Sequence, residues 1–403
     1  MPHSFGAFKN RNFSLFWVGM LISMIGTWIQ ITAQSWLVYK LTKSAFMLGL
    51  VSAAAFAPFF IFALIGGNFA DKFDKRKLLY ITQSAMAIFA FTLWILTKTG
   101  IINVWYLIII SLLAGIANAF DMPARQAFVY EIVGKEEIMN AVSMNSILFN
   151  AAQIVGPAIA GMIVASLGIS WCFLINSISF VAVIVALRLM ILKPQEIRLY
   201  KNNVSALQNI KEGLKFTWQN QTLKTIIFIT ALTAVFASPL GVLMPVFAKE
   251  IFKVDAKGFG VLMTCSGIGA LIGGLGIAAF GGVKKKGMVF FSAAIVLSIF
   301  MAIFSASKLF IFSSILLVVI GLCQVVQISI SNTLVQLTTT NEMRGRVMSI
   351  YSIAFMGLSP IGSIMSGSLA QIFGAPLTVT LNAAILGFGI FFIYRTNDQL
   401  KQL

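Results

Sequence analysis

The chain has 403 residues, of which 59% are hydrophobic and only 10% charged, and its formal net charge is +17. A soluble domain typically has roughly 45–50% apolar and 25% charged residues, so this chain has too little charge to cover a water-facing surface. The composition excludes an ordinary soluble protein and favours one whose surface faces a lipid bilayer.

Twelve segments are long and apolar enough to cross a membrane as helices, since a crossing needs about 20 residues over about 30 Å. In chain order they run Phe13–Trp36, Ala45–Ala70, Leu78–Leu96, Val104–Phe120, Asn140–Ser166, Trp171–Leu189, Leu223–Phe247, Gly258–Gly282, Met288–Ser305, Leu309–Asn332, Met348–Ile372 and Leu377–Tyr394. Their apolar residues are continuous, whereas those of membrane strands alternate. We therefore predict an all-α membrane protein with twelve transmembrane helices.

Basic residues between these segments are distributed unevenly. Loops on the N-terminal side, together with the central polar stretch, hold 22 of the 29 lysines and arginines, and the other side holds 7. Positively charged loops remain in the cytoplasm, so we expect both termini there. The positive net charge is then explained by the orientation of the chain in the bilayer, and no nucleic-acid partner is expected.

The longest polar stretch falls at the midpoint of the chain. It divides the sequence into an N-terminal six-helix half (residues 1–192), a cytoplasmic linker (193–222) and a C-terminal six-helix half (223–403). Apolar residues recur within the linker at helical spacing and predict an amphipathic helix at the membrane surface. They are Leu207, Ile210, Leu214 and Trp218.

The two halves show weak internal similarity. Leu48-Gly49-Leu50-Val51 is echoed by Phe259-Gly260-Val261-Leu262, and Lys75-Arg76 by Lys286-Gly287, both at an offset of 211. Later, Gly161 and Gly168 are echoed by Gly367 and Gly374 at an offset of 206. Such similarity in a twelve-span chain predicts two six-helix pseudo-repeats with a binding site between them.

A charged loop follows the second segment and reads Gly66-Gly67-Asn68-Phe69-Ala70-Asp71-Lys72-Phe73-Asp74-Lys75-Arg76-Lys77. It resembles the signature loop of the major facilitator superfamily, Gly-x-x-x-Asp-Arg/Lys-x-Gly-Arg/Lys-Arg/Lys. The residues that fit this pattern are Gly67, Asp71, Lys72, Lys75 and Arg76, and Asp74 replaces its second glycine.

Two further segments extend the resemblance. At the end of the fourth span, Asp121 and Arg125 are four residues apart, so they share a helix face and can pair. In the fifth span, Gly156-Pro157-Ala158-Ile159-Ala160-Gly161 is similar to the Gly-Pro motif of the superfamily's antiporters. With Gly26-Thr27-Trp28-Ile29-Gln30 in the first span, these residues resemble the branch that contains the enterobactin exporter and drug-proton antiporters.

The resemblance implies the major facilitator fold, in which two halves rock about a central site and charged loops latch the cytoplasmic side shut. The implied latch comprises Gly67, Asp71, Lys72, Lys75, Arg76, Asp121 and Arg125. In it Asp71 would face the helix start near Val347, and Lys75 or Arg76 would bridge toward Asp121. Gly282 stands where the second half should repeat Asp71, so the latch is expected to be asymmetric.

Polar side chains inside the spans mark the expected substrate path. Ser23, Thr27, Gln30 and Gln34 form one stripe at helical spacing, and similar stripes occur in the fifth and tenth spans. Because a polar group in hydrocarbon is costly unless it faces protein or water, the stripes predict a shared interior. The candidate path comprises Thr27, Gln30, Gln34, Asn118, Ser146, Asn150, Gln153, Gln324, Gln327 and Ser331. The alternative is that each stripe only makes hydrogen bonds between helices.

No aspartate or glutamate lies in the middle of a span, which disfavours a strongly cationic substrate bound by a membrane carboxylate. A proton-coupling group would then lie near the cytoplasmic ends, with Asp121 as the first candidate and Asp71 and Glu131 next. Coupling to another ion, or to none, stays open. A neutral path with aromatic walls suits a bulky amphipathic organic molecule, such as a siderophore or a lipophilic drug.

The sequence lacks the patterns of other functional classes. Its three cysteines are far apart and its single histidine, His3, lies in the N-terminal tail, so no metal site and no cofactor is expected. HExxH and GxSxG motifs are absent, and Gly134-Lys135 is followed by Glu136 rather than by the serine or threonine of a P-loop. A receptor or scaffold should carry large soluble domains, which the sequence lacks.

We therefore predict a secondary active exporter, and not an enzyme, that lies in the bacterial inner membrane as a monomer. Its partners would be a small-molecule substrate, the bilayer lipids, and protons or another coupling ion. Gly156, Pro157 and Gly161 are expected to serve helix packing. The alternatives are an importer of a small metabolite or lipid-like solute, and a non-transporting membrane receptor or scaffold.

Overall fold

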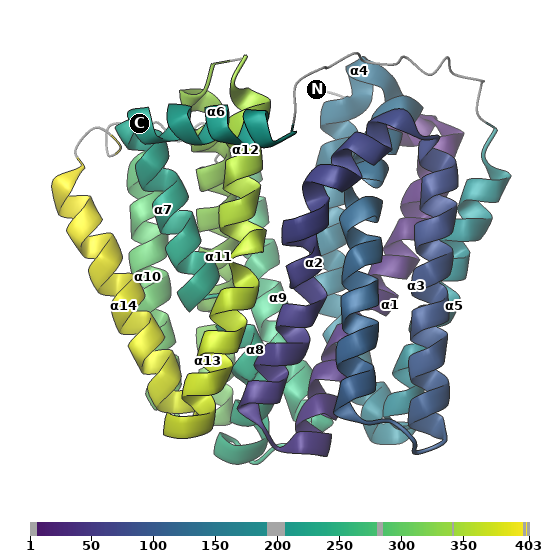
Figure 1. Ribbon diagram of the computed structural model, residues 1–403. Helices are drawn as coiled ribbons and strands as arrows, with labels where there is room; N and C mark the ends of the chain where they lie inside the picture. The colour runs from purple at the N-terminus through teal and green to yellow at the C-terminus, as the bar shows by residue number, and fades with distance from the viewer. Residues whose placement is uncertain (1–5, 192–205, 280–284, 341, 398–399, 401–403) are drawn as a thin grey trace. The chain divides into compact units, whose positions relative to one another are not determined.

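The computed structural model describes residues 6–191, 206–279, 285–340, 342–397 and 400, and for 59–61, 63–72 and 206–210 it describes the backbone only. The chain divides into two compact units, which Figure 1 draws as bundles of helices. Unit 1 comprises residues 1–41 and 57–202, and unit 2 comprises 42–56 and 203–403. Residues 42–56 thus pack with the second half of the sequence, whereas the sequence division assigns them to the first.

All regular structure in the described residues is helical. Unit 1 contains the short helix η1 (Gly6–Lys9), α1 (Arg11–Thr42), the second part of α2 (Ala45–Lys72), α3 (Lys75–Lys98), α4 (Val104–Ser166) and α5 (Ile169–Leu189). Unit 2 contains the first part of α2, α6 (Ala206–Gln219), α7 (Gln221–Phe236), α8 (Pro239–Val246), η2 (Phe247–Ile251), α9 (Ala256–Ala279), α10 (Lys286–Ala306), α11 (Phe310–Thr338), α12 (Arg344–Ser352), η3 (Ile353–Gly357), α13 (Ser359–Phe373) and α14 (Ala375–Thr396).

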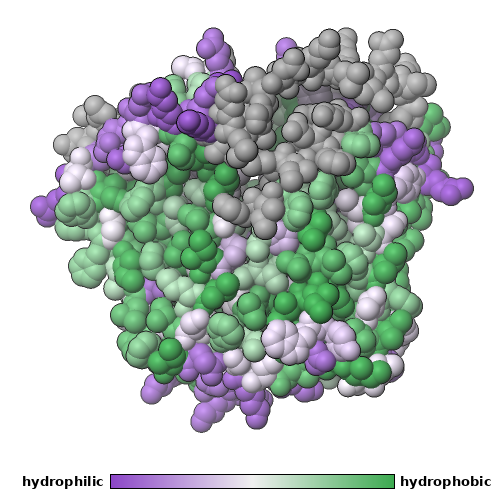
Figure 2. Space-filling view, viewed as in Figure 1, coloured by the Kyte–Doolittle hydropathy of each residue, from purple (hydrophilic) through white to green (hydrophobic). Residues whose placement is uncertain are grey.

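Ten helices among the described residues are long and apolar enough to cross a membrane. In Figure 2 the visible surface is hydrophobic along its middle, and hydrophilic residues gather toward the ends of the helices. Large apolar side chains are exposed in this band, such as Phe388 at 76%. Exposure of this kind is unfavourable in water and favourable in contact with lipid. The exposed surface therefore has the character that a lipid solvent requires.

Helix α4 joins two of the predicted spans. A straight helix of its 63 residues would be about 95 Å long, several times the thickness of a hydrocarbon core. The backbone of Gly134 interrupts it, with φ of 73° and ψ of −176°, a conformation that is essentially restricted to glycine. The break separates an apolar segment before Gly134 from another after it, and each is long enough for one crossing.

Short polar side chains set where several helices begin. The Asn103 side chain accepts hydrogen bonds from the amides of Trp105 and Tyr106 at the start of α4. Asp74, which departs from the signature-loop pattern, caps α3 by accepting from the amide of Lys77 at 3.1 Å. At the position where the family pattern has a glycine, the aspartate thus caps the helix that follows.

Helix starts in the two halves of the sequence recur at the offsets of the weak repeat. The starts of α2 and α9, and of α3 and α10, differ by 211 residues; those of α4 and α11, and of α5 and α14, differ by 206. Gly168 and Gly374, which precede α5 and α14, have φ of 98° and 84° and similar ψ angles. The repeat therefore extends from sequence to backbone conformation.

Aromatic and aliphatic side chains form the core of each unit. In unit 1, Phe16 of α1 packs edge-to-face on Phe128 of α4, with ring centroids 5.3 Å apart. In unit 2, Phe247 contacts Phe304 with centroids 4.9 Å apart. The first part of α2 joins unit 2 through Ser44, whose hydroxyl donates to the Gln371 amide oxygen at 2.8 Å.

The linker region forms a helix where its apolar spacing predicts one. Residues 193–205 lie outside the described residues, and α6 follows across the end of unit 2 (Figure 1). Glu212 of α6 forms an ion pair with Arg346 of α12, and Gly213 lies against the Arg346 carbonyl. Leu214 and Trp218 of the same helix are exposed.

Candidate functional site

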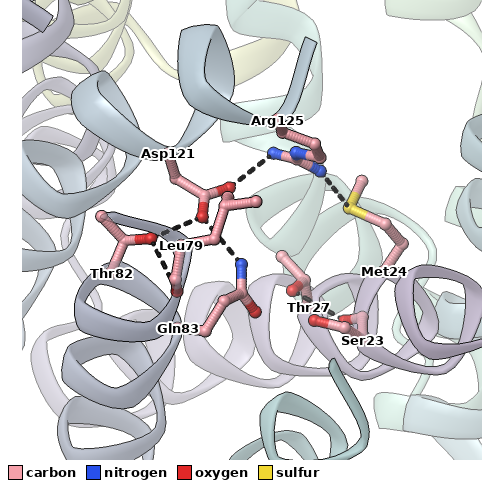
Figure 3. Close-up of polar contacts among 8 residues, drawn as sticks. All are labelled: Ser23, Met24, Thr27, Leu79, Thr82, Gln83, Asp121 and Arg125. Carbon is pink, nitrogen blue, oxygen red and sulfur yellow. Dashed lines mark hydrogen bonds and ion pairs between the residues drawn. The ribbon is translucent and has the colours of Figure 1, made fainter. Parts of the chain in front are cut away.

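A buried carboxylate between α3 and α4 is the centre of the polar cluster in unit 1. Asp121 is fully buried, and its Oδ1 accepts hydrogen bonds from the Thr82 hydroxyl at 2.7 Å and the Gln83 amide nitrogen at 2.8 Å. Its Oδ2 lies 3.0 Å from a guanidinium nitrogen of Arg125. Figure 3 shows these side chains converging on the carboxylate. A buried charge persists only when it is paired and hydrogen-bonded, as here.

Local helix geometry assembles this cluster. Thr82 and Gln83 are neighbours on α3, and both reach the same carboxylate oxygen. Asp121 and Arg125 are separated by one helical turn of α4, so the ion pair expected from their spacing forms. Arg125 also directs a second guanidinium nitrogen at the sulfur of Met24 on α1, 3.6 Å away (Figure 3).

Two details of the cluster bear on its chemistry. The Gln83 amide oxygen is buried and has no hydrogen-bond partner among the described residues. The Arg125 side chain is 24% exposed, whereas that of Asp121 is 1% exposed. The cluster therefore has a fully buried carboxylate, an accessible counter-charge and an unused acceptor.

The other basic residues of the loop take partners other than Asp121. Lys75 pairs with Glu131 at 2.8 Å, and both side chains are partly exposed. Arg76 donates to the backbone carbonyls of Leu187 and Met190 near the end of α5. The bridge from Lys75 or Arg76 to Asp121 that the resemblance implies is thus absent, because Arg125 occupies that place. The side chains of Gly67, Asp71 and Lys72, and all of Gly282, lie outside the described residues.

The polar stripe of α1 is hydrogen-bonded to neighbouring helices. The Gln30 amide oxygen accepts from Asn176 of α5 at 2.8 Å, and Gln34 donates to Ser111 of α4 at 2.8 Å. Thr27 donates within its own helix, to the Ser23 carbonyl. Gln30 and Gln34 remain partly exposed, so these bonds hold unit 1 together while leaving polar atoms at its surface.

The stripe of the predicted fifth span lies on a more open face of α4. Ser146 and Asn150 make hydrogen bonds to carbonyls of their own helix, 3.1 Å to Val142 and 2.9 Å to Ser146. Ser146 is exposed, and Asn150 and Gln153 are partly exposed. Asn118, earlier in α4, is also exposed. Among the candidate path residues of unit 1, Asn118 and Ser146 are therefore the exposed ones.

The stripe of α11 is mostly buried in unit 2. Gln327 is 2% exposed and donates to the Thr233 hydroxyl of α7 at 2.6 Å, and Ser331 bonds the Tyr351 hydroxyl at 2.9 Å. Only Gln324 of this stripe is partly exposed. The packing of Gln327 and Ser331 matches the alternative of hydrogen bonds between helices.

The offset of 206 residues places the two polar clusters at equivalent positions. Gln327 lies as far from the start of α11 as Asp121 does from the start of α4, and Ser331 corresponds in the same way to Arg125. Both pairs are buried or partly buried and spaced by one turn. A neutral pair in unit 2 therefore takes the place of the ion pair in unit 1.

The Gly-Pro segment of α4 makes a close helix contact. A Cβ atom on Gly156 would lie 2.4 Å from the Cβ of Trp28 on α1, so only glycine allows this approach. Pro157 and Gly161 are buried in the same helix. The packing role expected for this segment agrees with these contacts.

Some residues of the site are not predicted by the sequence, and they are the hydrogen-bond partners of residues that are predicted. Thr82, Gln83 and Asn176 are each polar residues within apolar spans, but no spacing links them to Asp121 or Gln30 in the sequence. Their isolation in a hydrophobic segment was the one available signal. Among the described residues, no group of three histidine, cysteine or acidic side chains is placed to hold a metal ion.

A family model described as "Transmembrane secretion effector", of the major facilitator superfamily, matches residues 3–401. The chain belongs to this family. As a member of the superfamily it is a multi-span integral membrane transporter rather than an enzyme. The resemblance seen in the charged loop and the Gly-Pro segment is thereby confirmed.

Curated relatives cover nearly the whole chain. The Staphyloferrin A transporter of Staphylococcus aureus is 28% identical over 397 residues, 96% of each chain. The multidrug efflux pump Tap of Mycolicibacterium fortuitum is 26% identical over 386 residues, 93% of each chain. Macrolide efflux protein A of Streptococcus pyogenes is 23% identical over 367 residues, 90% of each chain.

Solved structures share the fold at low sequence identity. A D-xylose-proton symporter matches with a TM-score of 0.75 and 15% identity over 99% of this chain and 100% of that one. A bacterial homologue of the human lysosomal transporter Spinster matches with a TM-score of 0.74 and 12% identity over 98% of each chain. The all-helical membrane fold of the superfamily therefore applies to this chain.

Proposed function

We propose that this transporter is a secondary exporter of bulky amphipathic organic molecules in the bacterial inner membrane. The observation that carries the proposal is the full-length match to a secretion family whose curated relatives are efflux proteins for drugs and macrolides and a transporter for the siderophore staphyloferrin A. The neutral, hydrogen-bonding residues on the accessible faces of α1 and α4 support a substrate without strong positive charge.

The topology that we propose has twelve crossings and two cytoplasmic termini. Ten helices qualify by length and composition in the described residues, α4 contains two apolar segments around Gly134, and α2 extends over 28 residues. Basic residues on the expected cytoplasmic side outnumber those on the other side by 22 to 7. This arrangement supports alternating access between two related halves.

Asp121 is our candidate for the proton-coupling group. In the ionised state its Oδ1 accepts from Thr82 and Gln83, and its Oδ2 is paired with Arg125. When the carboxylate takes up a proton, the new O–H needs an acceptor. Rotation of the Gln83 amide presents its unpaired oxygen to that proton and withdraws its NH₂ donor. The same side chain thus serves both protonation states.

Protonation also changes the environment of Arg125. The guanidinium loses its anionic partner, and among the described side chains it keeps the Met24 sulfur at 3.6 Å. A cation without a counter-ion in this setting moves toward water or toward another anion. Because Arg125 links α4 to α1 through Met24, we infer that proton uptake at Asp121 loosens the contact between these helices and permits the rocking motion.

The test uses purified protein in proteoliposomes loaded with a fluorescent drug or a ferric siderophore, with an imposed pH gradient. We expect gradient-driven substrate movement that Asp121→Asn abolishes, whereas substrate exchange without a gradient persists. Glu136→Gln, an exposed carboxylate change in α4, is the control and should leave both activities intact. Transport that ignores the collapse of the gradient would reject proton coupling while leaving export standing.

The direction of transport is tested in the same system. Inverted vesicles should accumulate the substrate if the protein exports it, and right-side-out vesicles should accumulate it if the protein is an importer. Failure of every tested solute to move in either preparation, with correctly folded protein, would reject bulky amphipathic molecules as the substrate class.

A further inference from the structure

An apolar groove on the surface of unit 2 lies between α10 and α11. Its volume is about 350 Å³, and its walls include Lys285, Met288, Ser292, Val296, Leu322 and Cys323. The α10 residues among them are spaced by three or four positions, so they form a single stripe along that helix. The groove is therefore an elongated channel along the helix rather than a round cavity.

The charge of the groove is confined to one end. Lys285 stands at the N-cap position of α10, is exposed, and is the one charged residue among the described residues that line the groove. The amide groups at a helix start carry a partial positive charge, which favours an anion nearby. Lys286, the first residue of α10, adds a second positive charge at this end. This end therefore suits a phosphate group.

The length of the groove matches half of a bilayer. From Lys285 to Val296 the helix rises about 16 Å, and the hydrocarbon of one leaflet is about 15 Å deep. A molecule with its anionic head at Lys285 would lay a hydrocarbon tail beside Met288, Ser292 and Val296. Among the constituents of a membrane, an anionic phospholipid has this shape and charge.

We propose that the α10–α11 groove is a binding site for one anionic phospholipid, with the headgroup phosphate at Lys285 and an acyl chain along Val296 and Leu322. The site lies entirely within unit 2, and it uses none of the residues assigned to substrate or proton movement. The experiment that tests this site measures bound lipid and not transport. Rejection of the proposed transport function would therefore not reject the lipid site.

The experiment uses the full-length protein in nanodiscs that contain phosphatidylglycerol with a photoactivatable group on one acyl chain. Peptide mass spectrometry then locates the cross-links. We expect them within residues 288–296 and 322–323. Lys285→Gln should reduce them about fivefold, the contribution of one lysine beside an anionic lipid, and Lys285→Arg should preserve them. Lys308→Gln, at the opposite end of α10, is the matched control and should have no effect.

A second variant tests the tail independently of the charge. Val296→Trp fills the groove, so it should lower cross-linking at residues 322–323 and leave folding intact, as judged by size-exclusion elution. Equal cross-linking by phosphatidylcholine, or labels spread evenly over other exposed helices such as α14, would overturn the proposal. Loss of labelling in Lys308→Gln equal to that in Lys285→Gln would do the same.

Discussion

The Gln83 amide nitrogen donates a 2.8 Å hydrogen bond to Oδ1 of Asp121, while its own amide oxygen is buried without a hydrogen-bond partner in the described part of the chain. A buried unsatisfied acceptor costs free energy. Its position beside a carboxylate makes it useful, because after rotation of the amide it can accept a hydrogen bond from the protonated carboxyl group.

The first prediction concerns Gln83→Met. This change keeps the length of the side chain and removes both the donor and the acceptor. Hydrogen bonds to charged groups contribute about 1.5–3 kcal/mol, so we expect proton-driven transport to fall tenfold or more. Initial rates in proteoliposomes across a range of imposed pH gradients measure the effect.

The matched control for this variant is Gln336→Met, at an exposed position on α11. It should transport like the parent protein. If Gln83→Met retains the parental rate and its dependence on pH, the amide has no part in proton handling.

The second prediction concerns the contact between α4 and α1. Gly156→Ala places a methyl group 2.4 Å from the Trp28 Cβ, so the helices must separate. Overpacking of this kind typically costs about 1–3 kcal/mol, and we expect a lower apparent melting temperature in detergent. Gly276→Ala in α9 meets no heavy atom within 4 Å and should be neutral or stabilising. Equal melting temperatures for the two variants would show that α1 and α4 are not closely packed.

The third prediction tests the repeat through backbone conformation. Gly168 and Gly374 adopt positive φ angles with extended ψ, which a side chain disfavours by about 1–3 kcal/mol. We expect Gly168→Ala and Gly374→Ala to lower thermal stability by similar amounts. Gly241→Ala in α8, where φ is not positive and no atom lies within 4 Å, is the comparison. If only one of the two variants were destabilised, the two halves would not share this backbone conformation.

The fourth prediction concerns the attachment of α6. Its ion pair between Glu212 and Arg346 is partly exposed, with side-chain exposures of 38% and 31%, so a contribution of only about 0.2–1 kcal/mol is expected. Glu212→Gln should therefore speed amide hydrogen exchange in α6 by up to about fivefold, and high salt should have the same effect on the parent protein. Lys215→Gln, on the exposed side of α6, should leave exchange unchanged. Unaltered exchange after Glu212→Gln would assign the attachment to apolar packing.

The sequence was sufficient to predict an all-helical membrane fold, because apolar length is a property of each segment by itself. Asn103 and Gly168 also mark helix starts that can be read locally. It did not predict that residues 42–56 pack with unit 2, since that depends on contacts such as Ser44 with Gln371, 327 positions apart. Tertiary packing decides such contacts.

In the candidate site, too, local features are predictable from the sequence and tertiary contacts are not. The pairing of Asp121 with Arg125 follows from helical spacing, and the structure contains it. The choice of Glu131 as the partner of Lys75 does not follow, because several acids were within reach along the sequence and only the relative placement of α3 and α4 selects one. The family resemblance predicts a bridge from Lys75 or Arg76 to Asp121, whereas Lys75 pairs with Glu131 in the structure.

The substitution of a neutral pair, Gln327 and Ser331, for Asp121 and Arg125 has a consequence for how the chain evolved. If the halves descend from one duplicated ancestor, their common helix position accepts either an ion pair or uncharged side chains and still folds. Replacing a buried ion pair by neutral groups is often harmless or stabilising. Folding alone therefore gives no reason to retain the charges in the first half, and selection for activity is the remaining force that would keep them.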